Sequence, residues 1–166
     1  MRVPLIAGVL LGVLVTLWSI LIVATGWYVN PAMVWTFSLV VLIEIGVLIW
    51  ALRKTAGEGR TYGSQVWAGL LTALIGGVLI FAGSLLITTV LYPDYFNDIR
   101  AMGAEMARRA GQSEAQVAAI LETPTQTPVE GAFAGFVGTV ATGLLASLII
   151  AAFLRRKSTR VAPVRS

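Results

Sequence analysis

Four long apolar runs constrain this chain more than any other feature of its sequence. They cover residues 3–24, 34–52, 66–91 and 132–154. An α-helix rises about 1.5 Å per residue, so each run is long enough to cross a hydrocarbon core of about 30 Å. Only 12% of the residues are charged, against about 25% in soluble domains. The sequence therefore predicts an all-α integral membrane protein with four transmembrane helices in a single domain, 1–157.

The distribution of basic residues predicts the orientation of the bundle. Nine of the 12 Lys and Arg residues lie before the first span, between spans two and three, or after span four. Because positively charged segments stay in the cytoplasm, both termini are expected there. The tail, 158–166, is expected to be flexible and to act as a basic anchor, with anionic lipid as a further partner. Aromatic residues expected at the outer interface are Trp27, Tyr28, Trp35, Tyr92, Tyr95 and Phe96.

The connection between spans three and four predicts two short helices on the outer side. In PDYFNDIRAMGAEMARRAG, apolar residues recur at helical spacing and Gly111 provides a helix stop. In SEAQVAAILETP, Ser113 and Gln116 form a capping box and Pro124 ends the helix. This hairpin, at about 93–122, is interpreted as a lid on the bundle or as a docking surface for an envelope protein. Amphipathic faces usually bury against their own protein, which favours the lid.

One carboxylate, Glu44, interrupts the second apolar run in the stretch VVLIEIGVLIW. It is expected near the bilayer centre, at the depth of Thr16 in span one and of Thr139 and Thr142 in span four. No Lys or Arg lies in any predicted span, so we expect a neutral carboxyl hydrogen-bonded to one of these threonines, with Thr142 and Thr139 favoured. The alternative is a site for a proton or a cation. Against it, the Glu44 face of its own helix carries no second polar group.

Small residues at helical spacing predict where the spans pack against one another. They are Gly8 and Gly12 in span one, Gly69, Ala73 and Gly77 in span three, and Gly135 and Gly138 in span four. Small residues let two helix backbones approach closely, and we expect these to join helices of the same chain. The Gly8 stretch is the best candidate for a contact between two copies in a homo-oligomer.

The residue inventory excludes much of enzyme chemistry. The chain has no Cys and no His, which removes thiolate and imidazole metal sites, haem ligands and nucleophiles activated by His. Asp94 and Asp98 lie outside the predicted spans, so they do not form an intramembrane aspartyl pair. The GEGR turn lacks the Lys and Ser or Thr of a phosphate-binding loop. We expect a non-enzymatic protein with no cofactor, no metal and no nucleic-acid partner.

Four segments together resemble a known family. They are GEGRTYGSQVWAGLLTALIGG, VLYPDYFNDI, GQSEAQVAAILE and FAGFVGTVATGLLASLIIAAFLRRK. In their order and spacing they resemble the bacterial four-span membrane proteins of domain-of-unknown-function family 4199. The resemblance implies a multi-pass protein of the bacterial cytoplasmic membrane with an outer helical insert between spans three and four. No activity is established for the family, so the resemblance implies no catalytic residues.

Two functions remain open at this point. The first, which the sequence favours, is a structural or accessory protein of the bacterial envelope whose outer hairpin contacts a partner protein or the membrane surface. The second is a small oligomeric transporter, or an ion- or proton-conducting protein, that uses Glu44. An oligomer is expected in the second case because four short helices enclose little space.

Overall fold

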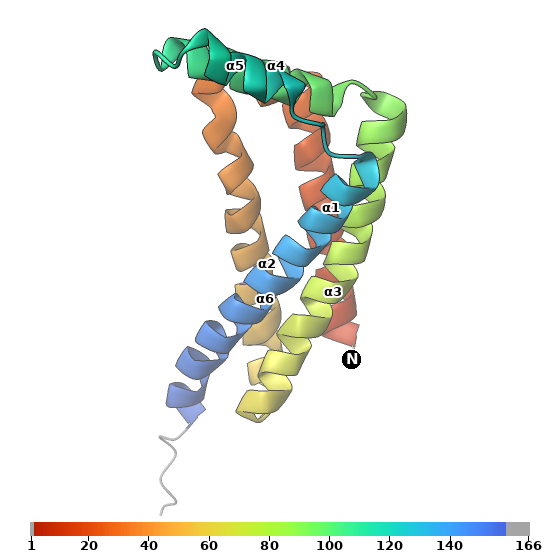
Figure 1. Ribbon diagram of the computed structural model, residues 1–166. Helices are drawn as coiled ribbons and strands as arrows, with labels where there is room; N and C mark the ends of the chain where they lie inside the picture. The colour runs from red at the N-terminus through yellow and green to blue at the C-terminus, as the bar shows by residue number, and fades with distance from the viewer. Residues whose placement is uncertain (1, 159–166) are drawn as a thin grey trace, which may run out of the picture.

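The computed structural model describes residues 2–158, and the regular structure of these residues is helical. Four long segments run side by side in one bundle (Figure 1). They are α1 (Arg2–Ala24), the 3-10 helix η2 (Pro31–Ser38) continued by α2 (Leu39–Ala56), α3 (Tyr62–Leu86) continued by the π-helix η3 (Ile87–Leu91), and α6 (Pro128–Ser158). Each segment is long and apolar enough to cross a membrane. The chain is therefore a multi-pass membrane protein that contacts the lipid bilayer, and the four predicted spans are confirmed as helices.

Two short helices, α4 (Tyr95–Arg109) and α5 (Glu114–Glu122), lie across one end of the bundle (Figure 1). We call this the capped end and the opposite end, with the turn from α2 to α3, the open end. The start of α1 and the end of α6 both lie toward the open end (Figure 1). Both short helices were predicted: Ser113 and Gln116 form the capping box, and Gly111 follows α4 with φ 77°. Apart from Ser158, the predicted basic tail lies outside the described residues.

The second span begins as a 3-10 helix, which the sequence did not predict. The side chain of Asn30 accepts a hydrogen bond from the Ala32 N–H at 3.0 Å and so caps η2. The indole of Trp18 in α1 donates to the Thr36 carbonyl at 3.2 Å and fixes η2 against α1. A 3-10 helix rises about 2 Å per residue. Glu44 therefore lies slightly nearer the open end than a continuous α-helix would place it.

The glycines of α1 pack against α3 within the same chain. A Cβ on Gly8 would lie 2.6 Å from Cβ of Ile75, and a Cβ on Gly12 would overlap Leu79. Real Cβ atoms essentially never approach another atom below 3.0 Å. At Gly8 and Gly12, the helices α1 and α3 therefore pack more closely than a side chain on α1 would allow. Gly8 is thus covered by α3 and does not offer the contact between copies that the sequence suggested as a candidate.

On the other side of α3, small residues face α6. Gly69 faces Ser147, Ala73 faces Gly143 and Gly77 faces Phe136. On α6 itself the predicted stripe was wrong in part, because a Cβ on Gly138 would meet no atom within 4 Å and one on Gly135 would meet only Ile80, at 3.9 Å. The buried small residues of α6 are instead Ala132, Thr139, Gly143, Ser147 and Ala151. The last four are spaced by four residues, and Gly143 and Ser147 among them face α3.

Candidate functional site

Glu44 lies where α2, α3 and α6 meet. Its side chain is 3% exposed. Oε1 of the carboxyl lies 3.1 Å from the position that a Cβ on Gly143 would take, and that same position overlaps Cβ of Ala73. Because Gly143 has no side chain, the Ala73 methyl group and the Glu44 carboxyl both fit against the backbone of α6. The glutamate is therefore accommodated by a glycine that belongs to another span.

The hydrogen bond predicted for Glu44 is not formed within residues 2–158. Oε1 has no hydrogen-bond partner there. Thr142 precedes Gly143 on α6, and successive residues of an α-helix point about 100° apart, so its hydroxyl faces another direction. An unpartnered buried polar atom costs about 1–3 kcal/mol. Packing alone does not explain why this position carries a carboxyl group.

A cavity of about 210 Å³ lies on the capped-end side of Glu44. Val40 and Thr139 belong to its lining, and they precede Glu44 and Gly143 by one helical turn, about 6 Å. All four spans contribute to the walls, and α4 contributes Tyr95. The polar residues of the lining are Thr16, Ser19, Ser84, Thr88, Tyr95 and Thr139. Two of the predicted threonines, Thr16 and Thr139, thus lie beside this cavity and not on the carboxyl.

Two irregular helical segments border the cavity. Phe37 comes from the 3-10 helix η2, and Ile87 and Thr88 come from the π-helix η3. The wide turn of η3 is closed by a hydrogen bond of 2.7 Å from the Tyr92 N–H to the Ile87 carbonyl, five residues earlier. Single π-helical turns occur frequently at functional sites. The cavity is therefore placed where the regular geometry of two spans is interrupted.

A pair of tyrosines holds α4 over the cavity. Tyr95 stacks on Tyr28 of the 3-10 helix η1 (Trp27–Val29), with 5.2 Å between ring centroids and 14° between planes. The Tyr28 hydroxyl donates a hydrogen bond of 2.5 Å to the Asp98 carboxylate. Burial, followed by this bond to a carboxylate, raises the pKa of Tyr28 to about 12. Burial also raises the pKa of Tyr95. The two stacked rings thus pack η1 against α4.

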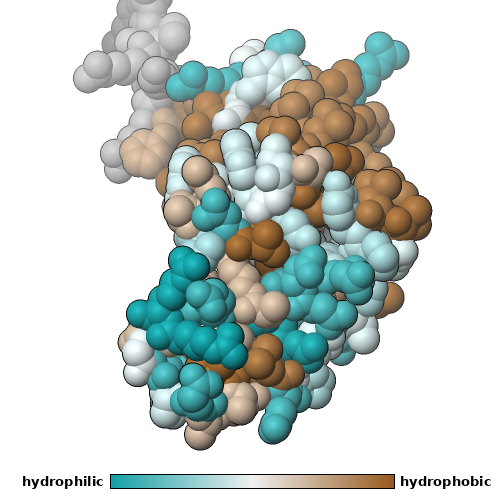
Figure 2. Space-filling view, turned by 90° about the horizontal axis from the view of Figure 1, so that it is seen from above, coloured by the Kyte–Doolittle hydropathy of each residue, from teal (hydrophilic) through white to brown (hydrophobic). Residues whose placement is uncertain are grey.

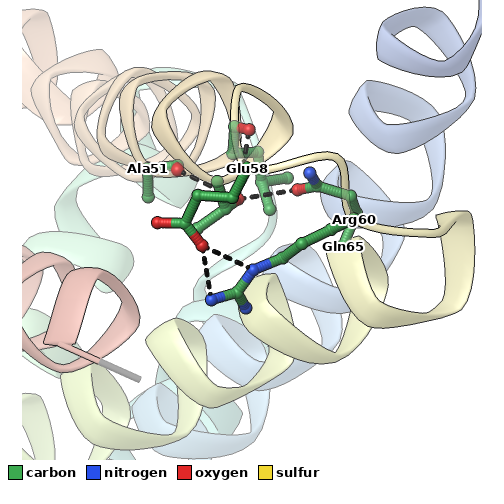
Figure 3. A network of polar contacts seen from close by, with 6 residues as sticks. Ala51, Glu58, Arg60 and Gln65 are labelled. Carbon is green, nitrogen blue, oxygen red and sulfur yellow. Dashed lines mark hydrogen bonds and ion pairs between the residues drawn. The ribbon is translucent and has the colours of Figure 1, made fainter. Parts of the chain in front are cut away.

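Buried polar groups also continue from Glu44 toward the open end. Ser147, one turn beyond Gly143, donates to the Gly143 carbonyl at 2.6 Å. Further along, the Thr55 hydroxyl and the Gln65 side-chain oxygen are 2.7 Å apart, near an ion pair of 2.7 Å between Arg60 and Glu58 (Figure 3). Nε2 of Gln65 has no partner within residues 2–158. The buried polar groups thus extend from the cavity, past Glu44, to the turn between α2 and α3.

Comparison with known proteins agrees with this architecture. The family model described as "Protein of unknown function (DUF4199)" matches residues 7–156, which run from α1 to α6. The chain belongs to the DUF4199 family. The resemblance inferred from the sequence segments is thereby confirmed. No curated protein and no solved structure gives a significant match to this DUF4199 chain.

Several residues around the site of this DUF4199 protein were missed in the sequence. Ser84 and Thr88 of α3 and η3, and Gly143 and Ser147 of α6, are each spaced by four residues. That spacing places each pair on one helix face, and it was the available signal. Depth along the spans had placed Thr16, Thr139 and Thr142 level with Glu44, whereas Ser84 and Thr88 lie further toward the capped end. The residues that line the cavity come from all four spans and from α4.

Proposed function

We propose that this DUF4199 protein is a small membrane transporter or conducting protein in which Glu44 binds and releases a proton. The observation that carries this proposal is the unpartnered Oε1 atom of a carboxyl group that is 3% exposed between three helices. Buried polar groups kept for structure are normally hydrogen-bonded. Ionisable residues inside membrane spans mark ion and proton pathways.

A route to Glu44 from the capped end supports the proposal. The cavity of about 210 Å³ ends about one helical turn, roughly 6 Å, from Glu44, and its hydroxyl groups and volume suit several water molecules. Beyond Glu44, the buried Ser147 hydroxyl begins the polar groups of the open-end side. The protonated carboxyl is the resting form in this proposal, because a charge near the bilayer centre is costly. Water entering the cavity would provide the exchange partner.

The orientation belongs to the same proposal. We place the protein in the bacterial cytoplasmic membrane with both termini in the cytoplasm and with α4 and α5 outside. Nine of the 12 basic residues fall on the cytoplasmic side in this arrangement. The cavity then lies in the outer half of the bilayer, and Glu44 receives its proton from outside.

Proton flux into liposomes tests the role of Glu44. The full chain is reconstituted with a pH-sensitive dye inside the vesicles, and a potassium gradient with valinomycin drives proton entry. We expect the wild type to acidify the lumen faster than protein-free vesicles, and Glu44→Gln, which keeps shape but does not titrate, to fall to the protein-free rate. The control Glu114→Gln removes an exposed carboxylate from α5 and should leave the flux unchanged. Equal flux in Glu44→Gln and wild type, or no flux in wild type, overturns the proposal.

A second candidate, a non-enzymatic accessory protein of the envelope, is favoured by the surface of the capped end. Seen from this end, hydrophilic side chains cover much of the surface and apolar ones lie among them (Figure 2). Met106 of α4 and Leu121 of α5 are each 40% exposed. Crosslinking in intact cells tests this candidate. A stoichiometric partner that is captured by the wild type and lost in Met106→Glu with Leu121→Glu supports it, whereas capture that these substitutions leave unchanged contradicts it.

A further inference from the structure

We infer that the cavity below α4 is a binding site for one small uncharged molecule with an apolar body about the size of one aromatic ring and a single hydroxyl or carbonyl group. This inference rests on the proposed function and deepens it, since such a molecule would be the solute whose movement is coupled to protonation of Glu44. It is argued from the size of the cavity, the absence of charge in its lining and the placement of its hydroxyl groups.

The size of the cavity sets the size of the ligand. Its volume is about 210 Å³, and an apolar protein cavity of about 150 Å³ is known to hold benzene. One substituted ring, or an aliphatic molecule of the same bulk, therefore fits. The walls are mostly apolar, with Val15, Val23 and Ile80 among them. They suit the hydrophobic body of such a molecule.

The chemistry of the lining excludes a charged ligand. None of the residues that the structure places around the cavity carries a formal charge. The Glu44 carboxyl lies one turn beyond the lining, and the Asp98 carboxylate accepts the hydrogen bond of Tyr28. An anion would meet no positive charge in the lining, and a cation would meet the Glu44 carboxyl in its protonated resting form, so either charge would lack a counter-ion at a cost of several kcal/mol. The ligand is therefore uncharged.

The hydroxyl groups around the cavity provide directional recognition. Ser19 and Thr88 donate to the carbonyls of Val15 and Ser84, at 2.9 and 2.8 Å, and keep oxygen lone pairs free. The hydroxyls of Thr16, Ser84 and Thr139 make no hydrogen bond within residues 2–158. They come from three different spans and all border the cavity. A ligand with one polar group would satisfy donors and acceptors that the protein itself leaves open. The two irregular segments, η2 and η3, adjoin the same space.

Binding is measured on the full chain in lipid nanodiscs with three fluorinated probes. These are 4-fluorophenol, 4-fluorotoluene of nearly the same size without the hydroxyl, and 4-fluorobenzoate with a negative charge. Fluorine NMR distinguishes bound probe from probe dissolved in lipid, and empty nanodiscs provide the reference. We expect saturable binding of 4-fluorophenol, about fivefold weaker binding of 4-fluorotoluene because one hydrogen bond is lost, and no binding of 4-fluorobenzoate.

Variants locate the bound probe. Ser84→Phe fills the cavity from α3 and should abolish saturable binding. The control Ala82→Phe adds the same ring two residues away, at an exposed position of the same helix, and should bind as the wild type does. Should Ser84→Phe fail to fold, the cavity-filling variant Gly135→Leu replaces it, because a Cβ on Gly135 meets only Ile80 at 3.9 Å. The pair Ser84→Ala with Thr139→Val should weaken 4-fluorophenol and leave 4-fluorotoluene unchanged.

The inference is overturned if 4-fluorophenol shows no saturable component in the wild type, if 4-fluorobenzoate binds best, or if the cavity-filling variant binds as the wild type does. Failure of the proposed function looks different. Glu44→Gln would then conduct protons like the wild type, and probe binding would still be lost in the filled cavity. If flux depends on Glu44 but no probe binds, the proton site at Glu44 is supported and only the inferred ligand site in the cavity is contradicted.

Discussion

The hydroxyl of Tyr28 donates a hydrogen bond of 2.5 Å to the carboxylate of Asp98 and joins η1 to α4. Asp98 lies one helical turn from Tyr95, whose ring stacks on Tyr28 and borders the cavity. Contacts with the bundle are reinforced at Gly131, where an added Cβ would overlap the ring of Phe96. The first turn of α4 is therefore attached to η1 and to α6, and its Tyr95 contributes to the wall of the cavity.

We expect Tyr28→Phe to loosen α4. Hydrogen bonds to charged groups contribute about 1.5–3 kcal/mol, so unfolding in detergent should become easier by that amount and the amides of α4 should exchange faster. Tyr62→Phe is the matched control, because the Tyr62 hydroxyl makes a longer bond of 3.3 Å to the Leu148 carbonyl in an exposed setting. Equal effects of the two substitutions would show that the Tyr28 contact is not special.

The stability of the protein should fall in strongly alkaline solution because of Tyr28. Its pKa is raised from 10.0 to about 12 in the folded state, so the folded protein holds this proton more tightly than the unfolded chain does. The contribution is fully present below pH 10.0 and is lost as the pH rises through about 12. Unfolding measured across this range should show a steeper loss in the wild type than in Tyr28→Phe. Parallel curves would contradict the assignment.

Replacing Glu44 should separate folding from function. Glu44→Leu is expected to unfold at the same or a higher temperature than the wild type, because it removes a buried oxygen that has no partner within residues 2–158. Glu44→Lys should be less stable by about 2.5–3.5 kcal/mol, since it places a cation near the bilayer centre. Thermal unfolding of the purified variants measures both. A large loss of stability in Glu44→Leu would indicate a structural carboxyl.

Two glycines of α6 should respond in opposite ways to alanine. Gly143→Ala would place a methyl group against Ala73 and 3.1 Å from Oε1 of Glu44, and overpacking of this kind costs about 1–3 kcal/mol. Gly138→Ala meets open space and should be neutral or stabilising by up to about 1 kcal/mol, because alanine favours a helix over glycine. Chemical denaturation of both variants is the measurement. The reverse order would mean that α6 is rotated relative to the structure.

Cysteine labelling tests the orientation in the membrane. The chain has no native Cys, so single cysteines report without background. Asn97→Cys in α4 should react with a membrane-impermeant reagent in intact cells, whereas Glu58→Cys at the open end should react only after lysis. Both side chains are exposed, so burial does not limit the reaction. The opposite pattern would place α4 and α5 in the cytoplasm.

The helices of this protein could be predicted from its sequence because their signals are local. Four apolar runs defined the spans, and Ser113 with Gln116 defined the start of α5. The 3-10 start of the second span was not predictable in this way. It accompanies a hydrogen bond from Trp18 of α1 to Thr36, and a contact between two different segments leaves no periodic pattern in either one.

The residues that surround Glu44 are decided by how each span is rotated about its own axis relative to the others. Its depth followed from counting residues along one helix, but its neighbours Ala73 and Gly143 come from two others. Moving by one residue along α6 turns the facing side chain by about 100°, and small residues are so frequent on α6 that several packing stripes compete. Close packing of α6 against α3 decides that Gly143, and not Thr142, faces Glu44. This packing depends on contacts between residues far apart in the sequence. It leaves the Oε1 atom of Glu44 without a partner among residues 2–158.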